Sequence, residues 1–247
     1  MPHASNASIL SFFAQLPRQS PGSAAHTAAA LGLLPAFAPG VRVADLGCGT
    51  GASTLVLAER LEGHILALDQ APEFLERLRQ EAAARGVLER VEAVVGDMAN
   101  PPVADGSLDL LWCEGAAYIL GFDAALARWR SLLKPTGFAV VSECSWLVPN
   151  PGLKARTFWY SAYPAMRTVL ENIERVEGAG YELLFTHTLP PECWAAYAES
   201  MDRALADLAA KGEALEPEFT RALRKEIDLF RHTGEEFSYV YYILGNR

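Results

Sequence analysis

The sequence predicts an α/β fold with a mostly parallel sheet, on three observations. Strand-like and helix-like segments alternate from residue 41 onward, the strand-like segments are short and apolar, and acidic or glycine-rich residues stand at the ends of several of them. Such alternation is typical of parallel strands joined by right-handed helical crossovers. A chain of 247 residues is long enough for one large domain, which is the organisation that we expect.

Five strand-like segments make up the first part of this alternation. They are Val41–Leu46, Ile65–Leu68, Val91–Val95, Leu108–Cys113 and Phe138–Glu143. Helix-like segments lie between them: Ser53–Leu61 has apolar residues at helical spacing, Pro72 stands where a first helical turn tolerates it, and Gly86 closes that second helix. Asp123 is expected to cap a third helix.

The two ends of the chain are organised differently from the middle. Residues 1–40 predict a helical cap, with a helix-like stretch at Ala24–Phe37. After residue 146, a break at 149–152 precedes a helix-like stretch with aromatic residues at Phe158, Trp159, Tyr160 and Tyr163. Two strands and two further helices are predicted after it: Tyr181–Thr188, Phe237–Leu244, Cys193–Lys211 and Pro217–Arg231. The two helices form an insertion at about residues 191–231, between the last two strands.

The composition argues against several classes of function. The formal net charge of −9 disfavours nucleic-acid binding, since phosphate contacts rest on clustered Lys and Arg. No apolar run reaches the roughly 18–20 residues of a membrane helix, and the opening residues lack a secretory signal. The four cysteines form no C-x-x-C pair, and the five histidines show no metal-binding spacing. We therefore expect no metal, no membrane and no nucleic-acid partner, with buried cysteines in a reducing cytoplasm.

Acidic residues stand at the carboxyl ends of the predicted strands. They are Asp45, Asp69, Asp97, Glu114 and Glu143. In open parallel sheets, ligands bind in the crevice beyond these strand ends, near the switch in strand order. We therefore expect a ligand site there.

A glycine-rich loop, Gly47-Cys48-Gly49-Thr50-Gly51, follows the first strand and opens a helix. Glycines allow tight turning and close approach of the backbone to a ligand. The pattern Gly47-x-Gly49-x-x-Ala52 also satisfies the relaxed dinucleotide fingerprint, so an NAD-dependent dehydrogenase is an alternative. However, Asp45 lies two positions before the loop, where a carboxylate disfavours a pyrophosphate and favours a cationic ligand. An acid at Asp69 suits a ribose diol, and one at Asp97 suits an exocyclic amine.

The run Asp45-Leu46-Gly47-Cys48-Gly49-Thr50-Gly51 resembles motif I of class I S-adenosylmethionine-dependent methyltransferases. Asp69 resembles the ribose-binding acid of that family, and Gly96-Asp97-Met98 resembles its adenine-contacting motif. Asp105–Asp109 and Leu133-Lys134-Pro135 also match, so the resemblance covers roughly residues 41–146. It implies a three-layer Rossmann-like fold with a seven-stranded, mostly parallel sheet whose last strand is antiparallel. It implies these cofactor-binding residues: Asp45, Gly47, Cys48, Gly49, Gly51, Asp69, Gln70, Asp97, Met98, Glu114 and Arg18.

The segment Leu16–Ser23 is similar to one that precedes the core in bacterial small-molecule methyltransferases of the ubiquinone/menaquinone C-methyltransferase-like group. Arg18 in this segment is implied to reach the cofactor carboxylate or the substrate, and the alternative is a solvated surface arginine. We expect one methyltransferase domain over residues 1–247. Its parts are the helical cap (1–40), the cofactor-binding core (41–146) and the substrate side (147–247).

Methyl transfer needs mainly alignment of the nucleophile with the methyl group, and a base only where the nucleophile carries a proton of high pKa. Glu114, after the fourth strand, is the candidate base or substrate-orienting group, unless it holds the cofactor or loop backbone. Tyr118 is a candidate hydrogen-bond partner of the substrate, unless it is a core or lid aromatic. We expect a small-molecule acceptor, methylated on carbon, oxygen or a small amine, and a monomer or homodimer. A non-catalytic S-adenosylmethionine binder and a protein or RNA methyltransferase are further alternatives.

Overall fold

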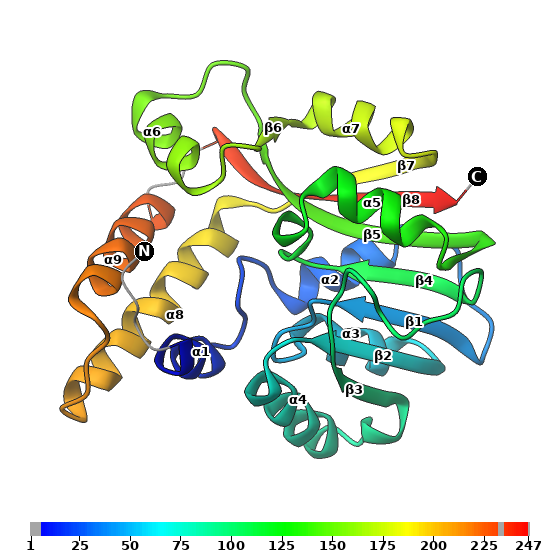
Figure 1. Cartoon of the computed structure of the whole chain (residues 1–247), viewed down its shortest axis with the longest axis horizontal. Coiled ribbons are helices and arrows are strands. Elements are labelled where there is room, and N and C mark those ends of the chain that lie inside the picture. Colours follow the sequence, from blue (N-terminus) through cyan, green and yellow to red (C-terminus); the bar gives the residue numbers. More distant parts are fainter. Residues whose placement is uncertain (1–5, 232–234, 247) are drawn as a thin grey trace.

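The sheet of this computed structural model confirms the predicted fold class. The structure describes residues 6–231 and 235–246, and the strands of that part follow the order β3-β2-β1-β4-β5-β8-β7 (Figure 1). The strands of this path are β1 (Val41–Leu46), β2 (Gly63–Asp69), β3 (Val91–Val95), β4 (Leu108–Cys113), β5 (Leu133–Trp146), β7 (Tyr181–Thr188) and β8 (Phe237–Asn246). A two-residue strand, β6 (Arg167–Thr168), adds to the side of β5.

The pairing of the strands places the expected crevice. β1 pairs in parallel with both β2 and β4, so the strand order reverses at β1. This is the switch point at which open α/β sheets bind their ligands. β8 runs antiparallel between β5 and β7, as the resemblance implied for the last strand.

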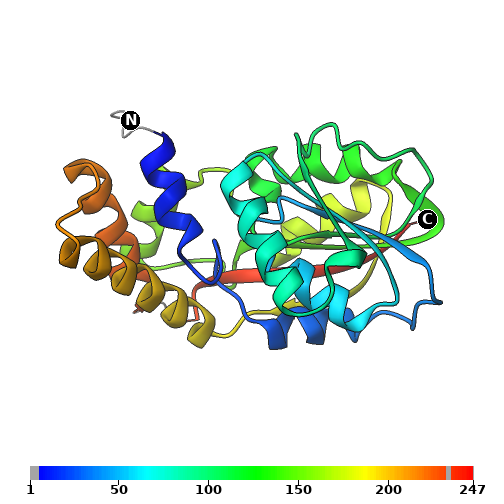
Figure 2. The same cartoon turned by 90° about the horizontal axis from the view of Figure 1, so that it is seen from below.

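Helices cover both faces of the sheet and complete the three layers (Figure 2). α2 (Ala24–Leu31), α3 (Ala52–Arg60) and α4 (Pro72–Ala84) contribute to the apolar core on one face. α5 (Phe122–Arg130) and α7 (Val169–Gly178) contribute to the core on the other. Two short 3₁₀ helices, η1 (Leu88–Arg90) and η2 (Ala117–Ile119), lie between strands and helices.

Four helices form a lobe beyond the carboxyl ends of the parallel strands, on the left of Figure 1. We call this the helical lobe; it consists of α1 (Asn6–Ala14), α6 (Leu153–Ala162), α8 (Pro191–Ala210) and α9 (Pro217–Arg231). Aromatic rings hold it together: the centroid of Phe230 lies 4.8 Å from that of Trp194 and 6.3 Å from that of Trp159. The predicted insertion at 191–231 is therefore a helical pair that packs over the strand ends rather than on a sheet face.

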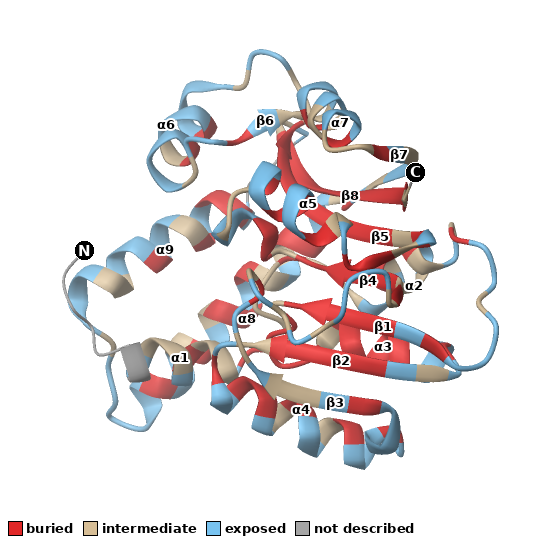
Figure 3. Ribbon diagram, turned by 45° about the vertical axis from the view of Figure 1, so that its right-hand side comes forward, coloured by how far each residue is buried: buried red, intermediate tan, exposed pale blue. Residues whose placement is uncertain are grey.

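Burial follows this architecture (Figure 3). The central strands are almost wholly buried, whereas α4, α8 and α9 alternate buried and exposed residues around the helix. Such stripes are typical of helices that cover a core with one face. No helix of the described residues is long and apolar enough to cross a bilayer. Over the same residues, no three His, Cys, Asp or Glu side chains gather closely enough to hold a metal ion.

Several predicted details are wrong. Asp123 is not the cap of α5, because Gly121 takes that place; the carboxylate of Asp123 instead accepts hydrogen bonds of 2.6 and 2.8 Å from Arg175. Glu143 lies within β5 rather than after it, because β5 continues to Trp146 alongside β8. The helix predicted at Ala24–Phe37 ends at Leu31.

One helix was not predicted. α7 begins with a capping box, in which Thr168 and Glu171 bond each other's backbone N–H groups. Residues 1–5 of the predicted cap, and residues 232–234 and 247 of the predicted substrate side, lie outside the described residues. The division of the chain at residues 40 and 146 stays a prediction.

Candidate functional site

A cavity of about 580 Å³ opens at the carboxyl ends of β1, β2 and β4, with α1 on its far side. Most of the predicted site residues line it: Arg18, Gly47, Cys48, Gly49, Asp69, Gln70, Met98, Glu114 and Tyr118. Three predicted site residues do not line it: Asp45, Gly51 and Asp97. The structure therefore brings together residues that are up to a hundred positions apart, on the edge of the sheet that the strand order selects.

The glycine loop (residues 47–51) uses its own N–H groups to hold its shape. The N–H groups of Gly47 and Cys48 both donate to the carbonyl of Leu68, at 2.8 and 3.0 Å. The N–H of Gly49 donates to Oδ2 of Asp69 at 2.8 Å. The last two amides of the loop donate to a side chain of the N-terminal segment and to the loop's own backbone. All five amides of the loop are thus engaged within the protein.

The glycines of this loop are required by its geometry. Gly47 has φ +72°, and a Cβ built on it would lie 2.5 Å from Cβ of Ala116. Gly51 has φ +86°, and a Cβ there would lie 2.1 Å from Cδ1 of Leu78. Side chains are strained at these φ angles and have no space here. Gly51 accordingly serves the packing of α3 on α4, outside the cavity.

Asp69 ends β2 and faces the cavity with a fixed carboxylate. Its Oδ2 accepts from Gly49, and its Oδ1 accepts from the N–H of Ala71 at 2.9 Å. Each carboxylate oxygen can accept more than one hydrogen bond, so both keep capacity for a ligand. The arrangement suits a pair of neighbouring hydroxyl groups.

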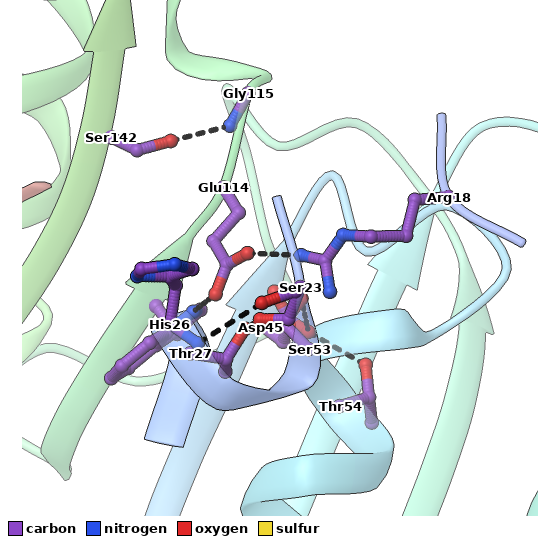
Figure 4. A network of polar contacts seen from close by, with 11 residues as sticks. Arg18, Ser23, His26, Thr27, Asp45, Ser53, Thr54, Glu114, Gly115 and Ser142 are labelled. Carbon is purple, nitrogen blue, oxygen red and sulfur yellow. Dashed lines mark hydrogen bonds and ion pairs between the residues drawn. The ribbon is translucent and has the colours of Figure 1, made fainter. Parts of the chain in front are cut away.

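The strap, residues 17–23, crosses the cavity from the helical lobe to α2. Arg18 in the strap forms an ion pair with Oε2 of Glu114, and Figure 4 shows its side chain reaching across to that carboxylate. The indole N–H of Trp112 donates to Oε1 of Glu114 at 2.8 Å. Both oxygens of Glu114 are therefore engaged, and the side chains of the pair are only 13% and 4% exposed. Such a buried pair presents one positive and one negative group side by side.

Comparison with known proteins identifies the core of the chain. Residues 43–137 match the family model of a methyltransferase domain. These residues carry the glycine loop, Asp69 and Glu114, which the structure gathers at one cavity. This match assigns residues 43–137 to a methyltransferase domain.

Curated relatives match this domain over part of their length. A nocamycin O-methyltransferase of Saccharothrix syringae is 37% identical over 102 residues, which are 40% of this chain and 36% of that protein. A ubiquinone/menaquinone biosynthesis C-methyltransferase of Dinoroseobacter shibae is 33% identical over 135 residues, 53% of this chain and 54% of that protein. The matched parts cover between 31% and 38% of the first three curated relatives.

Solved structures match nearly the whole chain. The crystal structure of YjhP from E. coli has a TM-score of 0.81 at 24% identity, covering 96% of this chain and 98% of that chain. A methyltransferase from Geobacter sulfurreducens, solved with S-adenosyl-L-homocysteine, has a TM-score of 0.76 at 21% identity, covering 94% and 93%. At these identities the likeness shows the fold, and it extends from the methyltransferase domain into the helical lobe.

Asp45 supports the methyltransferase domain from beneath the glycine loop. It is fully buried, and its Oδ2 accepts from the hydroxyls of Ser53 and Thr54, at 3.1 and 2.6 Å (Figure 4). Its Oδ1 has no hydrogen-bond partner among the described residues. Burial raises its pKa to about 7. The carboxyl fixes the start of α3, and its contact with a cofactor stays a prediction.

Met98 and Asp97 take opposite positions at the end of β3. Met98 is buried against the cavity, and its carbonyl accepts from the indole N–H of Trp129 at 2.8 Å. Asp97 is exposed, and its Oδ1 accepts from the N–H of Ala99 at 2.8 Å. The predicted stacking surface at Met98 thus lines the cavity, whereas the predicted amine-binding carboxylate lies at the turn beside it.

Cys48 and Gln70 line the cavity in different ways. The Cys48 thiol is buried, and burial raises its pKa, so the group stays neutral. Gln70 is exposed, next to Asp69. The contacts predicted for both with a cofactor stay predictions.

Tyr118, on η2, lines the same cavity as the glycine loop. Its ring packs edge-on against Tyr163, with 5.8 Å between the centroids. The Tyr163 hydroxyl donates to Oε1 of Glu143 at 2.5 Å. Glu143 is 1% exposed, its Oε2 has no hydrogen-bond partner among the described residues, and burial raises its pKa to about 7. A buried carboxyl with a raised pKa is therefore linked to Tyr118 through Tyr163.

Gln19 is a site residue that was not predicted. Its Oε1 accepts from the N–H and the hydroxyl of Thr50, at 2.9 and 3.1 Å, and its Nε2 donates to the carbonyl of Phe13 at 3.0 Å. The side chain thus connects the strap to the glycine loop. The only signal in the sequence is its place beside Arg18, in the segment with the weaker family resemblance.

Proposed function

We propose that the chain transfers a methyl group from S-adenosylmethionine to a small-molecule acceptor. The observation that carries this proposal is the cavity in which the self-bonded glycine loop, the fixed carboxylate of Asp69 and the Arg18–Glu114 pair face one another. The O- and C-methyltransferases among the relatives support it.

The nucleoside end of this cofactor suits the residues at β2 and β3. Asp69 offers two fixed oxygens to the ribose hydroxyls. Met98, Leu68 and Phe74 give an apolar surface for the adenine ring, and all three are buried. The glycine loop carries no free N–H between residues 47 and 51, which disfavours the pyrophosphate of NAD.

The amino-acid end of the cofactor suits the strap. A methionine tail carries one carboxylate and one ammonium group, and Arg18 and Glu114 offer the complementary charges at neighbouring positions. Both groups are desolvated, so the interactions are stronger than on the surface. Glu114 then serves as a cofactor ligand more readily than as a base, because Arg18 stabilises its charged form.

The chemistry that the cofactor supplies is an activated methyl group on a sulfonium. The protein contributes alignment, which can lower a barrier by roughly 7–11 kcal/mol. Tyr118 lines the cavity on the side away from the glycine loop, where it contacts the acceptor in our proposal. The lobe over the cavity and the formal net charge of −9 favour a small molecule over RNA.

The assembly and location are part of the same proposal. We propose a monomer or homodimer in the cytoplasm. All four cysteines are free and buried, which fits a reducing compartment.

Calorimetry with S-adenosylhomocysteine and with NAD tests the cofactor. We expect binding of the first and not the second, and Asp69→Asn is expected to weaken binding at least tenfold. Asp105→Asn, which changes an exposed carboxylate bonded only to Ser131, is the matched control. Labelled methyl donor with a small-metabolite extract then tests transfer. Binding of NAD, or tight S-adenosylhomocysteine binding without transfer to any component, would overturn the proposal in favour of a dehydrogenase or a non-catalytic binder.

A further inference from the structure

Helix α9 carries a carboxyl on the face that it turns toward the protein. Leu223, Ile227 and Phe230 are buried along this face, and Glu226 is half-buried on the same stripe. The other charged residues of this part of the helix are exposed: Arg221, Arg224, Lys225 and Asp228. The position of Glu226 is therefore unusual for a charged residue of an amphipathic helix.

Two contacts of α9 place this carboxyl beside the cavity. Two turns before it, the ring of Phe219 packs edge-on against Phe13, with 6.5 Å between the centroids. One turn after it, Phe230 lies 6.4 Å from Tyr197, whose hydroxyl donates to the carbonyl of Gln19 at 2.9 Å. Phe13 and Gln19 both line the cavity. Glu226 does not itself line the cavity; it lies on the helix face between these two contacts, next to residues that do.

Glu226 has no hydrogen bond or ion pair with the described residues. Burial raises its pKa to about 7, and its charge raises the pKa of Tyr118 and of Tyr197. Tyr118 lines the cavity, so the electrostatic influence of Glu226 reaches the cavity itself. A desolvated carboxyl without a partner costs free energy, which a ligand that bonds to it would offset.

A second polar group without a partner lies near the same space. The Tyr239 side chain is 9% exposed, and its hydroxyl makes no hydrogen bond with the described residues. Its Cζ lies 3.8 Å from the place that a Cβ on Gly115 would take, and Gly115 lines the cavity. Burial raises the pKa of this hydroxyl, so it stays protonated and can donate. We call Tyr118, Tyr239 and Glu226 the polar set; Tyr118 lines the cavity, and the other two lie behind its lining residues.

We propose that Glu226 binds the methyl acceptor through a hydrogen that the acceptor carries on nitrogen or oxygen, and that it takes this proton during transfer. The inference rests on the proposed methyl transfer. The acceptor heteroatom forms a bond to the methyl carbon as the carbon–sulfur bond breaks. The sulfonium leaves as a neutral thioether, and the acceptor's proton moves to an oxygen of Glu226. Charge and atoms balance without a further reactant.

Glu226 is better suited to this step than the other carboxyls near the cavity. Glu114 has both oxygens engaged, by Arg18 and Trp112. Glu143 accepts from Tyr163 and is 1% exposed, whereas Glu226 is half-buried and has no partner among the described residues. A proton acceptor works best when its pKa lies near the working pH and when it is free to bond the acceptor.

The test uses the full chain with ¹³C-methyl-labelled donor, a small-metabolite extract, and sets of small phenols and amines. The labelled products are examined by NMR, because the methyl shift distinguishes oxygen-, nitrogen- and carbon-bound methyl groups. Glu226→Gln is compared with Glu218→Gln, an exposed glutamate of the same helix. S-adenosylhomocysteine affinity and thermal unfolding of each variant show whether the fold and the cofactor site are intact.

We expect N- or O-methylated products, and the methyl shift shows whether the acceptor atom is nitrogen or oxygen. Glu226→Gln is expected to lower kcat/KM by about 100-fold or more and to flatten the pH dependence near neutrality, with S-adenosylhomocysteine affinity unchanged. Glu218→Gln is expected to retain activity within about twofold. A carbon-bound methyl product, or a Glu226→Gln variant as active as its control, would overturn this inference and leave the proposed methyl transfer standing. Absence of all transfer would overturn both.

Discussion

The two sides of the cavity differ in how their polar groups are satisfied. On the side of the glycine loop, the amides of residues 47–51, the carboxylate of Asp69 and both oxygens of Glu114 have partners within the chain. The exceptions there are two buried atoms, Nε of Arg18 and Oδ1 of Asp45. Toward the helical lobe, behind the lining residues, the carboxyl of Glu226 and the hydroxyl of Tyr239 have no partner among the described residues. The first side is preorganised before any ligand binds, whereas the second depends on a ligand to complete its bonds.

Removing the cation of the preorganised side gives the largest expected effect. Arg18→Met leaves the buried Glu114 without its cation, and we expect the free energy of unfolding to fall by about 3–5 kcal/mol. Urea unfolding measures the loss. The double variant Arg18→Met with Glu114→Gln should recover part of the stability but not the S-adenosylhomocysteine affinity. A loss below about 1 kcal/mol for the single variant would show that the pair is not desolvated.

The raised pKa of Glu143 predicts an unusual dependence of stability on pH. Glu143 titrates near pH 7 in the folded protein and near 4.5 when unfolded, so the folded state binds more protons in this range. Its contribution to stability is full below about pH 4.5 and is lost as the pH rises through 7. The free energy of unfolding of the parent protein should therefore fall by up to about 3 kcal/mol more between pH 5 and 8 than that of Glu143→Gln.

Unfolding in urea at several pH values measures this slope. Glu89→Gln, at an exposed site, is the control and should leave the slope unchanged. If Glu143→Gln has the slope of the parent protein, the carboxyl is charged in the folded state at pH 6.

A comparison of two glycines distinguishes the effect of backbone strain from the effect of a steric clash in the glycine loop. Gly47 and Gly106 have φ of +72° and +65°, but only Gly47 has a neighbour in the place of a Cβ. Gly106→Ala should cost about 1 kcal/mol of stability and leave S-adenosylhomocysteine affinity unchanged. Gly47→Ala should cost about 2 kcal/mol and also weaken that affinity. Calorimetry measures the affinities and thermal unfolding the stabilities. Equal S-adenosylhomocysteine affinities of the two variants would show that the glycine loop accommodates a side chain at residue 47.

The smallest effect is expected at the exposed ion pair between Asp123 on α5 and Arg175 on α7. Arg175 bonds Asp123 with both arms of its guanidinium, but the Asp123 side chain is 67% exposed. Asp123→Asn should lower the free energy of unfolding by less than about 1 kcal/mol, and less at high salt. A larger loss would mean that this pair also supports the wall that contains Tyr163.

The sequence predicted the sheet better than the site. Strands such as Val91–Val95 and Leu108–Cys113 were placed to the residue, because an apolar run between turn residues is a local signal. The antiparallel last strand was also confirmed, from the family resemblance. α7 was missed although its capping box is readable, because its apolar residues are few.

The orientation of the acids could not be predicted. The position of Asp45 at the end of β1 predicted a side chain in the cavity, but its partners Ser53 and Thr54 draw it beneath the loop. Glu226 was not singled out at all, because nothing local distinguishes it from the exposed charges around it on α9. Which face of a helix is covered depends on contacts with distant segments, here Phe13 and Tyr197.

The contact between Tyr197 and the backbone of Gln19 has a consequence for engineering of this protein. Exchange of the α8–α9 pair with that of a relative, to import a different acceptor preference, would remove this hydrogen bond between α8 and the strap. Residues 6–23 are therefore best transplanted together with residues 191–231, although almost the whole chain separates them. A graft of either segment by itself is expected to bring foreign side chains to the cavity and to leave the strap, and with it Arg18, less firmly positioned.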